Sequence, residues 1–362
     1  MKRRVKWVDT AKGIGIILVL LGHAPRDIMR LEYSWIDFGY YFIYTFHMHF
    51  FFFLSGYLFI YSAKEQPGMG IFAFLRRKAK GLLVPWLLIS LLVYSLIILV
   101  NKISLARVML EGTFLEQMPL KEYWLKSLSG DNPYCTHVWY MYTLFFVQIL
   151  VFLLLKIYQR LTEREKEPLQ FWIILEVISV VVYLFLPVGL PVLVSIKGYI
   201  LYYLLGAICC RAGLEKMTRF SWWMVFGPII CIMNVIAVDM GRWNNALGQY
   251  AVSCLCVFFG APIMILLMVC AARKIGEKSP LLTWLGKNSF MIYLFHQPFG
   301  CAVLGTVLVL LLPKKLVYYL LIMILCIIAS VGIPIIVEKV SKKLGLGLLL
   351  RLLTGGRGER IE

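Results

Sequence analysis

Long apolar runs separated by short polar and basic segments dominate the pattern of this chain of 362 residues. Several runs reach the roughly 20 apolar residues that a helix needs to cross a bilayer. Their spacing predicts ten helices, at residues 8–24, 38–62, 83–101, 137–157, 171–189, 197–213, 220–240, 249–271, 289–311 and 316–338. We therefore expect an all-α fold, a polytopic transmembrane helical bundle of about ten spans.

Composition supports a membrane protein and excludes an ordinary soluble enzyme. Hydrophobic residues make up 61% of the chain and charged residues only 15%, with a mean hydropathy of +0.81. A soluble domain carries about 25% charged residues. The lipid bilayer is therefore the first partner that the sequence predicts.

The basic residues predict the orientation of the chain. Of the 37 Lys and Arg residues, 26 fall in the segments that ten spans would place on one side, ten fall on the other side, and Lys12 lies inside the first span. Cytoplasmic loops carry the excess of Lys and Arg, so we expect both termini in the cytoplasm. The net charge of +18 is spread over these loops rather than gathered in a patch, so no nucleic-acid partner is expected.

The N-terminus resembles a secretory signal, with basic residues before an apolar run. Lys12, Gly13 and Gly15 interrupt that run, and the His-Ala-Pro that follows is a poor cleavage site. We therefore interpret it as a retained first span. The chain then divides into a transmembrane domain over residues 1–345 and a cytoplasmic C-terminal tail over 346–362.

Lys12 and His23 stand at opposite ends of the first predicted span. Eleven positions at 100° each give about 1100°, roughly 20° from three full turns, so both side chains share one helix face about 16–17 Å apart. Ionisable groups in a span usually face a polar interior and mark function. The alternative is that Lys12 extends to the cytoplasmic surface and His23 simply marks the other end of the helix.

Histidine is the residue type here that best suits proton transfer, because its imidazole is neutral near physiological pH and can act as a general base. The chain has five, His23, His47, His49, His137 and His296. For each, the alternative is a hydrogen-bonded packing role between helices. His47 and His49 would point about 200° apart on a helix and cannot chelate from one face, so we expect no metal. Nine cysteines without a CxxC pair likewise predict neither a metal site nor a disulfide framework.

A second basic feature, Arg76-Arg77-Lys78, precedes Pro85 at the cytoplasmic mouth of the third predicted span. It could be an anchor on anionic lipid heads. It could also bind a phosphorylated cytosolic ligand, because clustered Arg and Lys hold phosphate oxygens.

Five motifs stand in order along the chain. They are Asp9-x-x-Lys12-Gly…Gly22-His23, Phe46-His-Met-His-Phe-Phe-Phe-Phe-Leu-Ser55-Gly56-Tyr57, Arg76-Arg77-Lys78, His137-Val-Trp139-Tyr140 and Ser289…Tyr293-Leu-Phe-His296. Together they resemble the acyltransferase 3 family of integral membrane O-acyltransferases over about residues 5–340, closest to the stand-alone sugar O-acetylases such as fucose 4-O-acetylase.

This resemblance implies acetyl-CoA, or another short acyl-CoA, as co-substrate and a hydroxyl of a cell-envelope glycan or sugar-lipid as acceptor. It also implies a multi-pass protein of the plasma membrane, here a bacterial inner membrane. The family hallmark is a basic residue eleven positions before a histidine, and Lys12 and His23 occupy these positions. The usual residue at the first is arginine; lysine keeps its charge and loses its bidentate fork.

The resemblance and the spacing lead to one hypothesis for the site. His23 deprotonates the acceptor hydroxyl, Lys12 lines the pantetheine arm, and the basic run Arg76-Arg77-Lys78 holds the nucleotide phosphates of CoA. A covalent acyl-histidine step is left open. Positions expected on the acceptor or thioester side are Asp9, His47, Ser55, His137, Trp139, Tyr293 and His296.

The main alternative is a proton-coupled transporter of a small polar or glycan-related solute, with Lys12 and the histidines as a relay. The sequence shows no inverted repeat and no matched pair of Gly/Pro-broken helices, which such transporters often have. A purely structural or sensory membrane component would leave the Lys12–His23 spacing unexplained.

Overall fold

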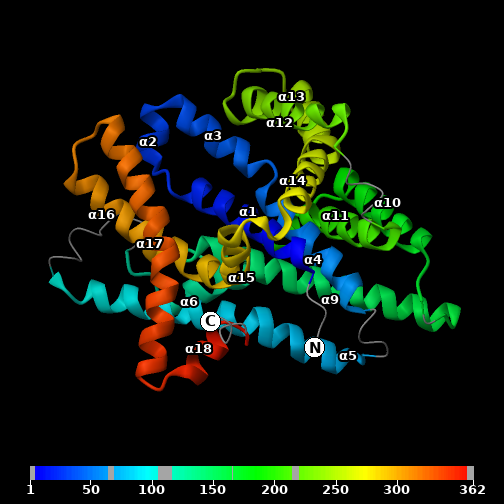
Figure 1. Cartoon of the computed structure of the whole chain (residues 1–362), viewed down its shortest axis with the longest axis horizontal. Coiled ribbons are helices and arrows are strands. Elements are labelled where there is room, and N and C mark those ends of the chain that lie inside the picture. Colours follow the sequence, from blue (N-terminus) through cyan, green and yellow to red (C-terminus); the bar gives the residue numbers. More distant parts are fainter. Residues whose placement is uncertain (1–4, 64–68, 105–115, 165, 214–219, 357–362) are drawn as a thin grey trace. The chain divides into compact units, whose positions relative to one another are not determined.

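The computed structural model describes residues 5–63, 69–104, 116–164, 166–213 and 220–356, and within these ranges the chain is helical without any strand (Figure 1). A helix lies at each of the ten positions that the hydropathy pattern predicts. The all-α, polytopic bundle is therefore confirmed.

The described chain contains eight helical segments long and apolar enough to cross a membrane: Ser34–Ser62, Ile71–Asn101, Thr136–Thr162, Pro191–Ala212, Trp222–Asp239, Ala246–Ile275, Pro280–Leu311 and Leu316–Lys343. Two of the ten predicted spans are not among them. Lys6–His23 is 18 residues long and carries Lys6, Asp9 and Lys12, while Leu169–Phe185 has 17 residues. Predicted and observed ends differ most at the third span, because helix Ile71–Lys78 continues through a π-helical turn into the apolar helix.

The chain forms two compact units. The first comprises residues 1–65 and 202–333. Its helices are α1 (Lys6–His23), α2 (Asp27–Glu32), α3 (Ser34–Tyr44), α4 (His47–Ala63), α12 (Phe226–Asn234), α13 (Ala246–Leu255), α14 (Ala261–Ile275), α15 (Pro280–Phe295) and α16 (Leu304–Leu311). π-Helical segments η5 (Val235–Asp239), η6 (Cys256–Gly260) and η8 (His296–Val303) follow α12, α13 and α15.

The second unit comprises residues 66–201 and 334–362. Its helices are α5 (Ile71–Lys78), π-helix η1 (Ala79–Leu83), α6 (Val84–Asn101), α8 (Leu120–Ser129), 3-10 helix η2 (Thr136–Val138), α9 (Trp139–Thr162), α10 (Leu169–Phe185) and α18 (Gly347–Leu353). The two divisions fall within α11 (Pro191–Ala212) and α17 (Leu316–Lys343).

In the first unit, α1 packs against α15 (Figure 1). A Cβ atom at Gly13 would collide with the carbonyl of Leu282, and one at Gly286 would collide with the carbonyl of Asp9. Small residues at such a contact let membrane helices approach closely. The Thr10 hydroxyl adds a 2.7 Å hydrogen bond to the carbonyl of Gly276. This contact fixes the position of α1, the helix that carries Lys12 and His23.

The second predicted helix, 38–62, is broken in the structure. α3 ends at Tyr44 and α4 begins at His47, with Thr45 and Phe46 in a turn. The carbonyl oxygen of Ile43 accepts from the backbone N–H of Phe46 at 3.3 Å and lies 2.8 Å from the ring Nδ1 of His47. The histidine side chain thus adds a second partner for a carbonyl at the break.

In the second unit, α8 is held on α6 by buried polar groups. The Tyr123 hydroxyl donates to the carbonyl of Ser90 at 3.0 Å, and the Asn132 amide donates to the Ser90 hydroxyl at 3.0 Å. The Asn132 side-chain oxygen accepts from the backbone N–H of Cys135 at 2.8 Å. Burial raises the pKa of Tyr123 to about 12 and raises the pKa of the Cys135 thiol, so both groups stay protonated at neutral pH.

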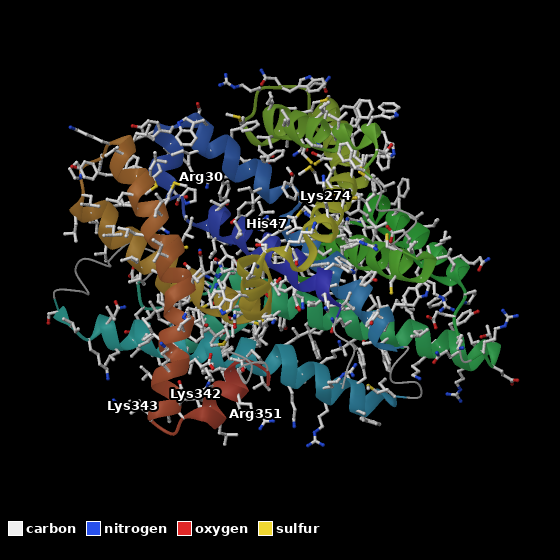
Figure 2. The ribbon with its side chains drawn as sticks, viewed as in Figure 1. Arg30, His47, Lys274, Lys342, Lys343 and Arg351 are labelled. Carbon is white, nitrogen blue, oxygen red and sulfur yellow. The ribbon has the colours of Figure 1, made fainter. Side chains whose placement is uncertain are left out.

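The last described residues are packed within this unit. α18 contacts α6 through buried Leu350, and Thr354 is fully buried. Gly355 has a φ of 60° and its missing Cβ would lie 2.9 Å from the Cα of Gly81. Figure 2 shows Lys342, Lys343 and Arg351 around the turn between α17 and α18. The predicted boundary at 345/346, with a cytoplasmic tail after it, stays a prediction.

Candidate active site

Three chain discontinuities of the first unit meet at the candidate site. These are the C-terminal end of α1 at His23, the break between α3 and α4 after Tyr44, and the point where α15 passes into π-helix η8 at His296. Helix ends and π-helical turns leave backbone groups outside the regular ladder, and such places often carry function. Each contributes one aromatic or imidazole ring.

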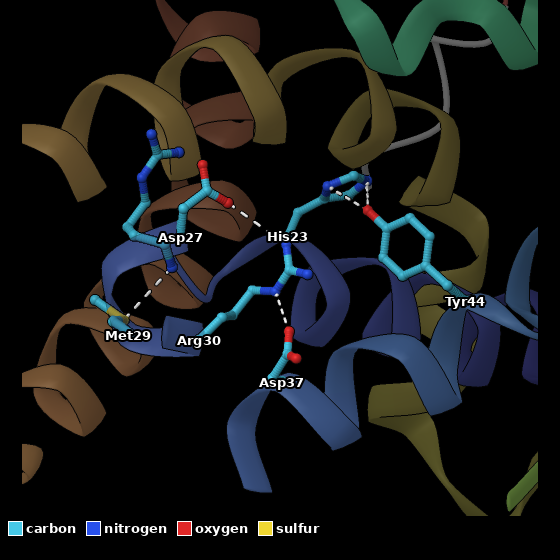
Figure 3. Close-up of polar contacts among 7 residues, drawn as sticks. His23, Asp27, Met29, Arg30, Asp37 and Tyr44 are labelled. Carbon is cyan, nitrogen blue, oxygen red and sulfur yellow. Dashed lines mark hydrogen bonds and ion pairs between the residues drawn. The ribbon is translucent and has the colours of Figure 1, made fainter. Parts of the chain in front are cut away.

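His23 contacts two other rings of this cluster, and Figure 3 shows its imidazole beside the Tyr44 hydroxyl. Its ring Nδ1 lies 3.1 Å from the hydroxyl of Tyr44, while its Nε2 lies farther from that hydroxyl, at 3.5 Å. The imidazole of His296 stands beside it with ring centroids 5.1 Å apart. His23 therefore has a hydroxyl partner on one side and a second imidazole as neighbour.

His47 and His296 are both held by a backbone carbonyl through Nδ1. His296 Nδ1 lies 2.8 Å from the carbonyl oxygen of Tyr293, and His47 Nδ1 lies 2.8 Å from that of Ile43. Since a carbonyl only accepts, each Nδ1 carries the proton in these bonds, and the Nε2 of a neutral ring then keeps its lone pair. The backbone thereby fixes the tautomer of both rings.

Burial separates the three histidines. His47 is 1% exposed and His296 is 0% exposed, whereas His23 is half-buried. The rings of Tyr44 and His47 lie 4.7 Å apart, and those of Tyr293 and His296 lie 5.9 Å apart. Of the three imidazoles in this cluster, only that of His23 is partly exposed.

The other predicted residues of the first unit lie outside the histidine cluster. Lys12 is half-buried on the same continuous helix as His23, so the shared face that their spacing predicts is present, and about 16–17 Å of helix separates them. Asp9 is buried at the contact of α1 with α15. Ser55 is half-buried on α4. His49 packs on Tyr202 at 4.3 Å between ring centroids, so its partner differs from those of the cluster.

The basic run belongs to the second unit, at the end of α5. Arg76 is exposed, while Arg77 and Lys78 are half-buried. The cations of Arg77 and Lys78 lie 5.7 Å and 5.1 Å from the ring centroid of Phe74. Two of the three cations of the run, Arg77 and Lys78, therefore lie within cation–π distance of a buried ring.

A further cation joins this group from α9. The ring of Phe74 stacks on that of Phe152 with 3.9 Å between centroids, and the Lys156 ammonium lies 5.6 Å from the centroid of Phe152. Lys156 was not singled out by the sequence analysis. Its position at the predicted cytoplasmic end of the fourth span was the available signal.

His137 and Trp139 also lie in the second unit, at the start of α9. His137 is buried, and the ring of Trp139 lies 4.8 Å from that of Tyr199. These residues therefore belong to the same unit as the basic run, while His23, His47, Tyr293 and His296 belong to the first.

Comparison with known families decides the class of the protein. The family model described as an acyltransferase domain, acyltransferase 3, matches residues 5–338 and so includes the helices of both units. The chain belongs to the acyltransferase 3 family. It is a multi-pass membrane acyltransferase. Searches of curated proteins and of solved structures find no match to this acyltransferase.

Two residues of the acyltransferase's first unit were missed as site residues. Tyr44 was not among the predicted site residues, yet its hydroxyl contacts His23. Arg30 was not predicted either, yet its guanidinium carbon lies 3.5 Å from the ring centroid of Tyr40 on α3. The spacing of Tyr40 and Tyr44, one helical turn apart, was the available signal for a shared face.

Across the described ranges of the acyltransferase, no three side chains of His, Cys, Asp or Glu come together as metal ligands. The imidazole of His23 can transfer a proton, and the phenol of Tyr44 can form a hydrogen bond to it. Both properties suit the activation of a hydroxyl group.

Proposed function

We propose that this acyltransferase moves an acetyl or other short acyl group from acyl-CoA to a hydroxyl of a cell-envelope glycan or sugar-lipid, with His23 as general base. The observation that carries the proposal is the setting of His23. It is the half-buried member of the histidine cluster, and its Nδ1 lies 3.1 Å from the hydroxyl of Tyr44.

Tyr44 gives His23 the orientation that a general base needs. The Tyr44 hydroxyl lies 3.1 Å from Nδ1 and 3.5 Å from Nε2 of His23, so it restrains the ring by its contact with both nitrogens. A base held by a third group is an arrangement that recurs in hydrolases on unrelated folds. We propose Nε2, the nitrogen farther from Tyr44, as the atom that takes the proton of the acceptor hydroxyl.

The reaction proceeds as one proton transfer and one exchange of bonds at the acyl carbonyl. As His23 Nε2 removes the proton, the acceptor oxygen forms its bond to the thioester carbonyl carbon. The bond from that carbon to sulfur breaks, and the leaving CoA thiolate takes the proton back from Nε2. The products are an ester and free CoA, and His23 returns to its neutral form. General-base assistance of this kind contributes about 10²–10⁴-fold.

We assign a different part of the CoA donor to the cations of each unit. In the second unit, the basic run and Lys156 surround the stacked pair Phe74 and Phe152, and clustered cations favour the phosphates of CoA. In the first unit, Lys12 on α1 is proposed to contact the pantetheine arm. Asp9, Ser55, His137 and Trp139 remain candidates for substrate contacts.

The location follows from the same proposal. CoA is a cytosolic donor, and the excess of Lys and Arg on one side predicts cytoplasmic termini. We propose a bacterial plasma membrane as the site of action, with the basic run on the cytoplasmic side and His23 toward the outer side.

Membranes that contain the protein test this function directly. They are incubated with acetyl-CoA carrying a radiolabelled acetyl group, and label is counted in extracted glycans and sugar-lipids. We expect incorporation above that of membranes lacking the protein, chased by unlabelled acetyl-CoA. Incorporation equal to that of control membranes, together with proton-coupled solute flux in reconstituted vesicles, would contradict the proposal and favour a transporter.

A further inference from the structure

A row of side chains in mutual contact in the first unit leads from Arg30 on α2 to His23. The guanidinium carbon of Arg30 lies 3.5 Å from the ring centroid of Tyr40, within contact distance of the ring face. The ring of Tyr40 lies 4.2 Å from that of Tyr44 at an interplanar angle of 30°. Tyr44 in turn contacts His23. Each member therefore limits the movement of the next.

Two carboxylates hold Arg30, the member of this row farthest from His23 (Figure 3). Arg30 Nε donates to Asp37 at 2.9 Å, and a terminal nitrogen of Arg30 donates to Asp27 at 3.4 Å. Burial of Arg30 lowers its pKa, but the hydrogen bond to Asp37 and the neighbouring Tyr40 and Tyr41 outweigh this and raise the pKa above its ordinary value. The guanidinium is thus a permanent cation with a fixed plane.

The row restrains Tyr44, the residue whose hydroxyl contacts the proposed base His23. Tyr44 is the last residue of α3, directly before the break at Thr45 and Phe46, where the backbone ladder is incomplete. The backbone of a residue at a helix end does little to restrain the position of its side-chain ring. The contact with Tyr40, one turn earlier on the same helix, supplies that restraint.

We propose that Arg30 and Tyr40 are positioning residues that act through Tyr44 to hold the imidazole of His23 in one tautomer. This inference rests on the proposed role of His23 as general base. Asp37 belongs to the same device, because it fixes the guanidinium plane that lies over Tyr40. Neither Arg30 nor Tyr40 touches the reacting atoms in this account.

The first test reads the tautomer of His23 and needs no activity. Protein labelled with ¹⁵N-histidine gives a ring-nitrogen signal for each imidazole, and the His23 signal is assigned by its loss in His23→Ala. We expect one tautomer with the proton on Nδ1 in the wild type and in Tyr40→Phe, which keeps the ring. In Tyr40→Ala we expect a mixture of tautomers. An unchanged His23 signal in folded Tyr40→Ala would overturn the proposal.

The second test separates positioning from general stability. Initial rates of acetyl transfer give kcat and the KM for acetyl-CoA. We expect Tyr40→Ala to lower kcat about tenfold with an unchanged KM, and Tyr40→Phe to keep the wild-type kcat. In a Tyr44→Phe background, Tyr40→Ala should add little, because the row acts through the Tyr44 hydroxyl. Full additivity of the two losses would contradict a shared route.

Trp35→Ala is the matched control, because Trp35 is an aromatic residue of the same helix with 54% of its surface exposed. It should leave both the His23 signal and kcat unchanged. Since Arg30→Ala removes two ion pairs and could prevent folding, Arg30→Lys is the variant used at that position. It keeps the charge but not the planar fork, and should resemble Tyr40→Ala. Full activity in His23→Ala would contradict the proposed role of His23 as general base. The ¹⁵N experiment would still show whether Arg30 and Tyr40 hold the His23 ring.

Discussion

At the scale of single residues, the site depends on which atoms hold the imidazoles. Backbone carbonyls fix His47 and His296 through Nδ1, and both rings are fully buried. His23 is half-buried and is held by a phenol. These histidines could be predicted as candidate site residues, because the sequence shows their number and their place in apolar runs. It could not show that Tyr44 is the partner of His23, because that contact joins two helices across a break.

Tyr44→Phe tests the hydroxyl contact alone. The variant keeps the ring and removes one hydrogen bond to His23. Loss of about 1.4 kcal/mol of transition-state stabilisation corresponds to about a tenfold lower kcat. We expect that decrease with an unchanged KM for acetyl-CoA in steady-state assays. A kcat equal to that of the wild type would show that the hydroxyl does not orient the base.

Lys12 is the second residue-scale prediction. It occupies the hallmark position at which the family usually has arginine, which is likewise a basic residue. We expect Lys12→Arg to keep the KM for acetyl-CoA and Lys12→Ala to raise it about tenfold or more. Titration with acetyl-CoA under initial-rate conditions measures both. Equal KM values in Lys12→Ala and the wild type would remove Lys12 from the donor site.

Tyr123 gives a prediction for pH. Its folded-state pKa of about 12 lies above the roughly 10 of an unfolded tyrosine, so the protonated phenol stabilises the fold fully below about pH 10. This contribution is lost as pH rises toward about 12. Thermal unfolding between pH 9 and about 11 should therefore show Tm falling more steeply in the wild type than in Tyr123→Phe. Parallel curves would contradict a buried, protonated Tyr123.

At the scale of elements, all ten helix positions could be predicted from apolar runs, because length and hydropathy alone decide them. The break at Thr45 and Phe46 could not, since no proline or glycine marks it and its carbonyls are satisfied by side chains. The π-helical start of η8 at His296 is likewise set by packing. The close approach of α1 and α15 was not predicted either, because Gly286 was not recognised as a residue at a helix contact.

Gly286→Ala tests that approach. The added Cβ would meet the backbone of Asp9 and Gly13, which can yield only if the two helices move apart. Overpacking of this kind costs about 1–3 kcal/mol, so we expect a clearly lower Tm in detergent. Gly39→Ala is the control, because nothing lies within 4 Å of its new Cβ. Similar Tm values for both variants would contradict direct backbone contact.

At the scale of the whole molecule, the family match over residues 5–338 includes helices of both compact units. The order of the basic run, the histidines and the hallmark pair along the chain could be read from the sequence, and the family assignment is confirmed. The division of these residues between units could not, since each unit is built from segments far apart in sequence. His23, His47 and His296 come together because α1, α4 and η8 belong to one unit.

The orientation of the chain in the membrane is a prediction about the whole molecule. The distribution of Lys and Arg places both termini in the cytoplasm and residues 241–248 outside. A green fluorescent protein fused after the C-terminus should fluoresce, and an alkaline phosphatase inserted near residue 244 should be active. An active phosphatase at the C-terminus would reverse the orientation and with it the assignment of the basic run to cytosolic CoA.

The central claim is that His23 is the general base, and one measurement tests it most directly. Acetyl transfer from labelled acetyl-CoA into membrane glycans is compared for the wild type, His23→Ala and His49→Ala at matched expression. His49 is the control because it is a histidine of α4 that packs on Tyr202. The account predicts a loss of at least about 10²-fold in His23→Ala and little change in His49→Ala. Wild-type incorporation by folded His23→Ala would contradict it and turn attention to His296 or His137.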